Sequence, residues 1–251
     1  GEVQVKYDIA HDEVGVSSLI SESVLYTLTT SNLSLHSLTS SSVVTSTSTS
    51  TKFDNTCFSL DPHSASGSVV SVGVGKDVVT IDARTGKKAG GYIECHKYRI
   101  EDIDYNPHRP SYLCTSGRDC TVRFWDVRYP SPTPVKTTET TQPERVLEGH
   151  DHWVRNVRYN PFHDQLVASG GTDGGVGLWR VSSVSSAPIM SLTNSDNNGS
   201  PGGVGTGVLP DGRVGVFKEH GDSVTGLEWS ACDAWCVGST GWEGKIVVDH
   251  V

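Results

Sequence analysis

Apolar and aromatic residues recur in the same order in three stretches of the chain, residues 96–107, 150–161 and 220–231. Each stretch begins with His, followed four residues later by an apolar residue, three later by another, and two later by an aromatic residue. These residues are Ile100, Ile103 and Tyr105, then Val154, Val157 and Tyr159, then Val224, Leu227 and Trp229. The second and third of each set alternate as on one face of a β-strand. Such self-similarity indicates a repeat architecture, in which each copy is one structural unit.

Polar residues continue the repeat downstream at fixed offsets from the His. They are Thr115, Asp119 and Trp125 after His96, Ser169, Asp173 and Trp179 after His150, and Ser239, Glu243 and Asp249 after His220. A buried Trp indole N–H needs an acceptor, and a Ser or Thr hydroxyl can accept it while bonding to the His that the Asp holds. We therefore predict a structural hydrogen-bond network, in which a buried member left unpaired would cost about 1–3 kcal/mol. Its predicted members are His96, Thr115, Asp119, Trp125, His150, Ser169, Asp173, Trp179, His220 and Ser239.

The fold follows from the spacing of these residues. The pair Gly149 and His150, the Ser–Asp–Trp offsets and the run 124–126 (Phe-Trp-Asp) resemble the WD repeat of β-propellers, in which each repeat supplies a four-stranded blade. Weaker copies lie at 25–38 and 68–84. We expect one all-β WD-repeat propeller domain over residues 1–251, with five blade equivalents that are part of a seven-bladed ring. The blade equivalents are expected around 5–38, 53–84, 96–128, 150–181 and 217–251, with inserts at 39–52, 129–145 and 182–216.

Composition and charge narrow the function classes. Lys and Arg number 20 against 29 Asp and Glu, and this net charge of −9 argues against an electrostatic grip on nucleic acid. No apolar run is long enough to span a membrane, so we expect no integral membrane segment. The six cysteines lack paired CxxC spacing, so we expect no metal site. The histidines are explained by their repeat position, so we expect no catalytic residue, no enzymatic activity and no cofactor.

Two features of the repeats are candidates for binding protein partners. In WD repeats, the turn residue before the Asp and the residues after the His face the top surface. The partner-binding candidates there are Tyr98, Arg99, Arg118, His152, Trp153 and Trp242, with Thr172 and Ser223 beside them. Exposed Trp and Arg are typical of interface hot spots. Each residue alone is better explained as ordinary surface, whereas the set together favours a partner-binding surface.

The second feature is the run 125–128 (Trp-Asp-Val-Arg), preceded by Asp119. It resembles the motif by which WD-repeat proteins dock on the adaptor of a cullin-RING ubiquitin ligase, and this resemblance assigns the contact to Arg128. The alternative is that Asp126 and Arg128 close a strand turn of the blade.

Longer stretches are more particular than a generic blade. They are DIDYNP, TSGRDCTVRFWDVR, LEGHDHWVRNVRYNPFHDQLVASGGTDGGVGLWRVSSVSSAP and EHGDSVTGLEWS. Over residues 53–251 the sequence resembles the family of the EARP- and GARP-complex-interacting protein. The resemblance implies a cytoplasmic seven-bladed scaffold that binds tethering complexes at endosomes and the trans-Golgi network and supports endosomal recycling and retrograde transport. The alternatives are a substrate receptor of a cullin-RING ubiquitin ligase and a generic protein-interaction scaffold of another assembly.

Overall fold

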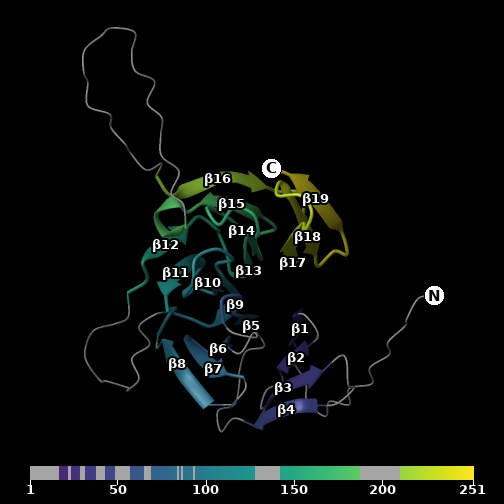
Figure 1. Ribbon diagram of the computed structural model, residues 1–251. Coiled ribbons are helices and arrows are strands. Elements are labelled where there is room, and N and C mark those ends of the chain that lie inside the picture. The colour runs from purple at the N-terminus through teal and green to yellow at the C-terminus, as the bar shows by residue number, and fades with distance from the viewer. Residues whose placement is uncertain are drawn as a thin grey trace, which may run out of the picture.

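The computed structural model describes residues 17–21, 24–28, 32–37, 43–48, 57–64, 69–83, 85, 87–92, 94–127, 142–186 and 210–251, with the backbone alone for the strands before residue 49. Within these ranges the chain forms nineteen strands in five antiparallel sheets and one short 3-10 helix (Figure 1). The expectation of an all-β fold is thereby confirmed. No helix in the described part of the chain has the length and apolar composition needed to cross a membrane.

The sheets follow one another in chain order, and every strand pairs with its immediate neighbour in sequence. The first sheet holds β1 (Ser17–Ser21), β2 (Val24–Leu28), β3 (Asn32–Ser37) and β4 (Val43–Ser48), and the second holds β5 (Phe58–Leu60), β6 (Val69–Val74), β7 (Asp77–Asp82) and β8 (Lys87–Tyr92). The third holds β9 (Ile100–Tyr105), β10 (Tyr112–Gly117), β11 (Thr121–Asp126) and β12 (Arg145–Glu148). The fourth holds β13 (Val154–Tyr159), β14 (Leu166–Gly171), β15 (Val176–Arg180) and β16 (Gly212–Phe217), and the fifth β17 (Val224–Trp229), β18 (Cys236–Gly241) and β19 (Ile246–His250).

The first strands of successive sheets lie beside one another. Strand β9 packs against β5 and β6, β13 against β9 and β10, and β17 against β13 and β14. Figure 1 shows these four sheets following one another in an arc from β5–β8 to β17–β19, with their first strands toward the centre. This is the arrangement of blades in a β-propeller, with each sheet as one blade.

Side chains join the innermost strands across the gap between sheets, where no backbone ladder runs. The carboxylate of Asp102 accepts the backbone N–H of Val157 at 3.1 Å, and that of Asp104 accepts the N–H of Tyr159 at 2.8 Å. The guanidinium of Arg158 on β13 also donates to Asp102 and lies 3.3 Å from Glu228 on β17. The backbone N–H groups of Val157 and Tyr159 are therefore satisfied by side chains of β9, as buried N–H groups require.

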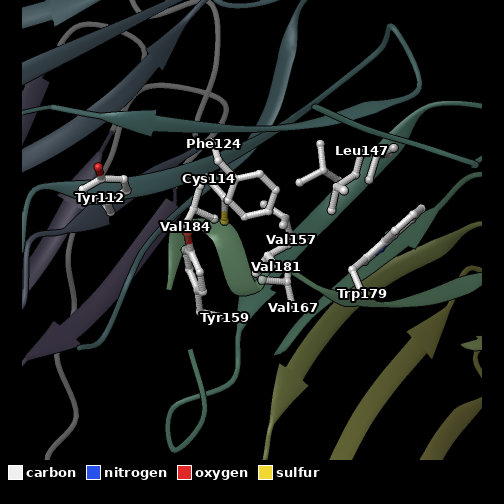
Figure 2. Packing of buried hydrophobic residues seen from close by; sticks show 12 residues of the cluster. Tyr112, Cys114, Phe124, Leu147, Val157, Tyr159, Val167, Trp179, Val181 and Val184 are labelled. Carbon is white, nitrogen blue, oxygen red and sulfur yellow. The ribbon is translucent and has the colours of Figure 1, made fainter. Parts of the chain in front are cut away.

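The largest apolar cluster lies between the third and fourth sheets (Figure 2). Phe124 on β11 meets Tyr159 on β13 edge to face, with ring centroids 6.0 Å apart. Val122 and Cys114 from the third sheet and Val154 and Val157 from the fourth belong to the same cluster. Burying each such apolar side chain contributes about 1.5–3 kcal/mol, so this packing fixes the two sheets relative to each other.

A short segment after β15 adds to this cluster from the end of the sheets opposite His96 and His150. The helix η2 (Ser182–Val184) follows Val181, and both Val181 and Val184 are buried in the cluster. The far side of the segment is closed by Asp211, whose carboxylate accepts the backbone N–H of Ser183 at 3.0 Å. Residues 183 and 211 are thus held side by side.

Two of the outermost strands overlap ranges that the sequence predicts as inserts. Strand β4 lies within 39–52, and most of β16 lies within 182–216. Within the expected insert over 39–52 the chain forms the strand Val43–Ser48, whose valines and β-branched threonines suit this conformation. The Gly-rich β16 alternates only weakly between buried and exposed positions, which hides it in the sequence. The division of the whole chain into five blade equivalents stays a prediction.

Candidate functional site

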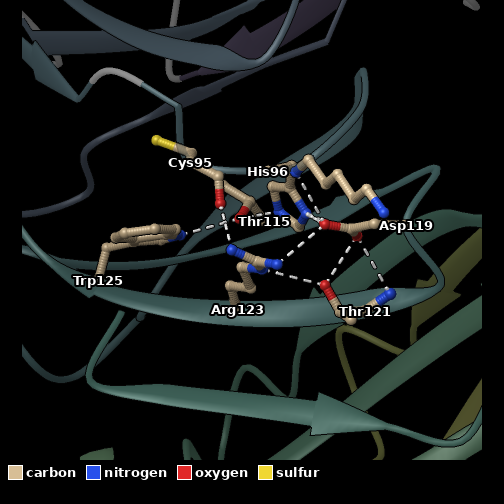
Figure 3. Close-up of polar contacts among 8 residues, drawn as sticks. Cys95, His96, Thr115, Asp119, Thr121, Arg123 and Trp125 are labelled. Atoms are coloured by element: carbon tan, nitrogen blue, oxygen red, sulfur yellow. Dashed lines mark hydrogen bonds and ion pairs between the residues drawn. The ribbon is translucent and has the colours of Figure 1, made fainter. Parts of the chain in front are cut away.

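The third sheet assembles the four network residues predicted from its repeat (Figure 3). Trp125 Nε1 donates to Thr115 Oγ1 at 2.9 Å, and Thr115 Oγ1 lies 2.7 Å from His96 Nε2. His96 Nδ1 lies 2.9 Å from Asp119 Oδ1. Because the carboxylate accepts from Nδ1, the Thr115 hydroxyl donates to Nε2 while it accepts from the indole. The loop before β9 and the β10–β11 turn are thereby fixed to the middle of the sheet.

The fourth sheet repeats these contacts with nearly equal lengths. His150 Nδ1 lies 3.0 Å from Asp173 Oδ2, and His150 Nε2 lies 2.7 Å from Ser169 Oγ. Trp179 Nε1 donates to the same hydroxyl at 2.7 Å. The structure thus brings together all four residues that share these offsets.

The fifth sheet keeps part of the network. His220 Nδ1 lies 2.9 Å from Glu243 Oε1, and His220 Nε2 lies 2.8 Å from Ser239 Oγ. Asp249 stands at the tryptophan position and supplies no indole donor. A longer acid therefore replaces the Asp without breaking the link to the His.

Burial and pairing set the ionisation of these groups. Burial lowers the pKa of His96 below its usual value and outweighs the opposing effect of Asp119. Burial also opposes ionisation of Asp119, but the hydrogen bond and charge of His96 outweigh it and hold the pKa of that carboxyl well below its usual range. The pKa of Asp173 is lowered too, because the charge of His150 and the N–H of Gly175 outweigh burial. These carboxylates stay ionised and paired, which suits a structural role.

Arg123 is a network member that the repeat pattern does not reveal. Its Nη2 lies 3.0 Å from Asp119 Oδ2, and its Nη1 donates to the carbonyl of Cys95 at 2.9 Å (Figure 3). The signal is an arginine four residues after the aspartate. Gly177 stands at the same position of the fourth sheet, where the indole of Trp179 fills the space that a Cβ would enter.

The partner-binding candidates lie above these networks, at the end of the sheets that we call the top rim. The top rim comprises residues 94–99, 117–120, 149–153, 171–175, 218–223 and 241–245. Its loops are joined in pairs, since the N–H of Arg118 donates to the carbonyl of Arg99 at 3.0 Å, and that of Thr172 to the carbonyl of Trp153 at 2.9 Å. The same contact joins Trp242 to Ser223 at 2.9 Å.

Four of the rim side chains and Glu101 of β9 form one connected surface, the rim platform, which consists of Arg99, Glu101, Arg118, His152 and Trp153. The guanidinium carbon of Arg118 lies 4.4 Å from the centroid of the Trp153 ring, so a residue of the third sheet covers one of the fourth. The His152 and Trp153 rings stack at 4.9 Å with an interplanar angle of 30°. His152 Nδ1 lies 2.5 Å from Thr172 Oγ1.

Two further candidates stand beside the platform on the same rim. Tyr98 is 52% exposed, with the ammonium of Lys97 5.4 Å from its ring centroid. Trp242 is 73% exposed and belongs to the fifth sheet. Arg128, on which the cullin-RING hypothesis rests, lies outside the described residues.

Comparison with known proteins places this arrangement in a family. The EIPR1 beta-propeller model matches residues 15–179, and the model of the WD domain, G-beta repeat, matches residues 212–248. The chain belongs to the EIPR1 β-propeller family. The family and the propeller fold expected from the sequence are both confirmed, and a WD β-propeller is a non-catalytic kind of fold.

Two relatives are named for interaction with EARP or GARP complexes, and a third is named as a WD repeat-containing protein. Human EARP and GARP complex-interacting protein 1 is 36% identical over 161 residues, which are 62% of this chain and 39% of the human protein. EARP-interacting protein 1 of Caenorhabditis elegans is 32% identical over 190 residues, 76% of this chain and 49% of that protein. WD repeat-containing protein DWA2 of Arabidopsis thaliana is 27% identical over 175 residues, which are 68% of this chain and 42% of that protein. The chain spans less than half of the length of these relatives.

Asp164 is a second residue, after Arg123, whose structural role in this EIPR1 β-propeller member the sequence analysis did not predict. Its carboxylate is buried and accepts from Asn106 Nδ2 at 3.1 Å, from the N–H of Ser186 at 2.6 Å and from the hydroxyl of Ser186 at 3.1 Å. It therefore ties the β9–β10 turn to the segment that ends in Ser186. The run VSSVSS that marks the family resemblance is the segment so held, with its two valines in the core.

Proposed function

We propose that this chain is a non-enzymatic adaptor that binds EARP and GARP tethering complexes through the top rim of its propeller. The observation that carries the proposal is membership of the EIPR1 β-propeller family, whose relatives are named for interaction with these complexes. In this role the protein works in the cytoplasm, peripherally associated with endosomes and the trans-Golgi network, in endosomal recycling and retrograde transport.

The rim platform supports the choice of surface. Its side chains are already held by stacking and hydrogen bonds, so a partner that docks there loses little side-chain entropy in ordering them. Tryptophan and arginine are also the residues that most often dominate binding energy in protein interfaces. Trp153 is 38% exposed, which leaves part of its ring open to a partner.

The test is affinity purification of the tagged chain from cells, followed by mass spectrometry. Subunits of the tethering complexes should co-purify with the wild-type protein, and Trp153→Ala should lose them. Capture of no tethering subunit by the wild-type protein would overturn the proposal.

A matched control lies at the opposite end of the same blades. Trp235 is 44% exposed and stacks on His163 at 5.2 Å, much as Trp153 stacks on His152. Trp235→Ala should therefore retain the subunits. Loss of capture in this variant but not in Trp153→Ala would move the docking surface to the other end of the propeller.

A further inference from the structure

Two arginines of the rim platform share a single carboxylate. Arg118 Nε donates to Glu101 Oε1 at 2.5 Å, and Arg99 Nε lies 3.7 Å from the same oxygen, too far for a hydrogen bond. Among the residues that the structure describes, Glu101 is the one acidic side chain paired with either of them. The buried Arg99 Nε has no hydrogen-bond partner there. Since each guanidinium has five N–H donors, the pair retains one net positive charge and most of its donors.

The exposure of these groups places the surplus charge at the surface. The side chains of Arg99 and Arg118 are 41% and 35% exposed, whereas that of Glu101 is 11% exposed. The neighbouring Asp119 is already paired with His96 and Arg123 beneath the rim. The arginines therefore present cationic donors to solvent from a chain whose overall charge is −9.

Aromatic surface adjoins both cations. Arg118 lies over the ring of Trp153, and Tyr98 precedes Arg99 with half of its side chain exposed. A ligand for this surface needs anionic groups beside apolar ones. On the fourth sheet the exposed Asp151 directly precedes His152 in sequence, so a ligand carboxylate is favoured on the side of the two arginines.

We propose that Arg99 and Arg118 form a carboxylate-binding subsite, flanked by Trp153 and Tyr98, that takes an extended acidic peptide segment of the partner protein. The inference rests on the proposed function, since it names the kind of segment by which the tethering complex docks. A carboxylate can accept paired N–H groups from a guanidinium with good geometry, and such charge-assisted bonds are among the stronger ones. Opposite charge also steers the encounter of the two proteins.

A peptide fits better than an anionic membrane or a nucleic acid. The rim platform holds two cations, Arg99 and Arg118, and Lys97 lies close to them in sequence, whereas lipid recognition generally uses clusters of about four to eight. The net charge of −9 also repels phosphate-rich surfaces as a whole. Arginine next to tryptophan is the composition of a protein hot spot.

The experiment uses two short fluorescent peptides and measures binding to the purified chain by anisotropy. In one peptide Glu alternates with Leu and Phe, and in its twin Gln replaces each Glu. The Glu peptide should bind the wild-type protein and the Gln peptide should bind about tenfold more weakly, as expected for a lost charge-assisted hydrogen bond. Equal binding of the two peptides would overturn the proposal.

Matched charge reversals on the top rim locate the site. Arg99→Glu should weaken binding of the Glu peptide by about tenfold or more. Lys245→Glu makes the same charge change on the fifth sheet, where Lys245 pairs with Glu219, and should leave binding unchanged. Equal effects of the two variants would show general electrostatics and would refute the subsite. Thermal unfolding checks both folds, and Arg99→Gln carries the test if Arg99→Glu is unfolded.

Capture from cells separates this inference from the proposed function. If the wild-type protein and Arg99→Glu capture tethering subunits equally, the subsite is refuted and the adaptor function stands. If the wild-type protein captures none but Arg99→Glu abolishes binding of the Glu peptide, the adaptor function fails and the acidic-segment site stands. The last measurement is co-sedimentation with vesicles that contain phosphatidylserine. If the wild-type protein sediments with them and Arg99→Glu does not, the ligand of the subsite is an anionic membrane and the peptide proposal is refuted.

Discussion

The fourth and fifth sheets share a backbone frame and differ in what fills it. Strands β13–β14 and β17–β18 pair in the same register, with the same irregularity near their start. The bond from His150 to Ser169 measures 2.7 Å, and that from His220 to Ser239 measures 2.8 Å. The frame therefore forms whether or not a tryptophan completes the network.

The two sheets differ in their third strands. Asp249 of β19 stands at the position that Trp179 occupies in β15, and Val248, which is 68% exposed, stands at the position of the buried Leu178. Strand β17 packs against the fourth sheet and buries Leu178 in the shared cluster. Equivalent residues thus owe their burial to a neighbouring sheet, whereas the His–Ser link is internal to each blade.

The largest expected effect tests this difference directly. Leu178→Ala should lower the free energy of unfolding by about 2–5 kcal/mol, because it leaves a cavity against β17. Val248→Ala, the equivalent change on the exposed face, should stay within about 0.5 kcal/mol. Urea denaturation of both variants measures the two values. Equal losses would mean that the exposed face of the fifth sheet is covered in solution.

The tryptophan is tested by removing its donor at nearly constant size. Trp179→Phe should destabilise by about 1–3 kcal/mol, because the Ser169 hydroxyl loses the indole N–H. The measurement is again the free energy of unfolding, with Trp235→Phe as a control at an exposed position. A neutral result for Trp179→Phe would show that the indole bond adds nothing to the frame.

A pH titration probes the innermost strands. Burial raises the pKa of Asp104 to about 7, although the charge of Arg158 opposes the shift. The folded state then holds a proton that the unfolded chain releases near its ordinary value of 3.8. The stability that this proton contributes is fully present below about pH 4 and is lost as the pH rises through 7.

Asp104→Asn should remove this part of the pH dependence. The difference in unfolding free energy between wild type and variant should change by at most about 1.4 kcal/mol per pH unit within that window. Denaturation at a series of pH values measures it. Parallel profiles of the two proteins would contradict the assignment.

The smallest effect concerns the rim. Trp242→Ala should change the free energy of unfolding by less than about 0.5 kcal/mol, because its side chain is 73% exposed. Thermal or urea unfolding is sufficient to check this. A large loss would show that the rim of the fifth sheet contributes to the fold.

The sequence pattern predicts the hydrogen bonds that form between residues of the same repeat. The offsets of His96, Thr115, Asp119 and Trp125 are local, because antiparallel neighbours joined by short turns keep a fixed register. The stacking of Arg118 on Trp153 joins two sheets, so its geometry depends on how blades pack and was not visible in either repeat. The polar strands β4 and β16 were missed because they alternate weakly and resemble loops in composition.

The clamp formed by Asp211 and Ser183 has a consequence for the length of chain between them. The N–H of Ser183 donates to Asp211 at 3.0 Å, so this hydrogen bond closes a ring of chain, and the entropy of closing that ring depends on its length. Each doubling of such a length costs about 0.6 kcal/mol. The ring-closure cost of a longer chain between Ser183 and Asp211 is therefore small, and this hydrogen bond keeps the two ends of the ring together at any length.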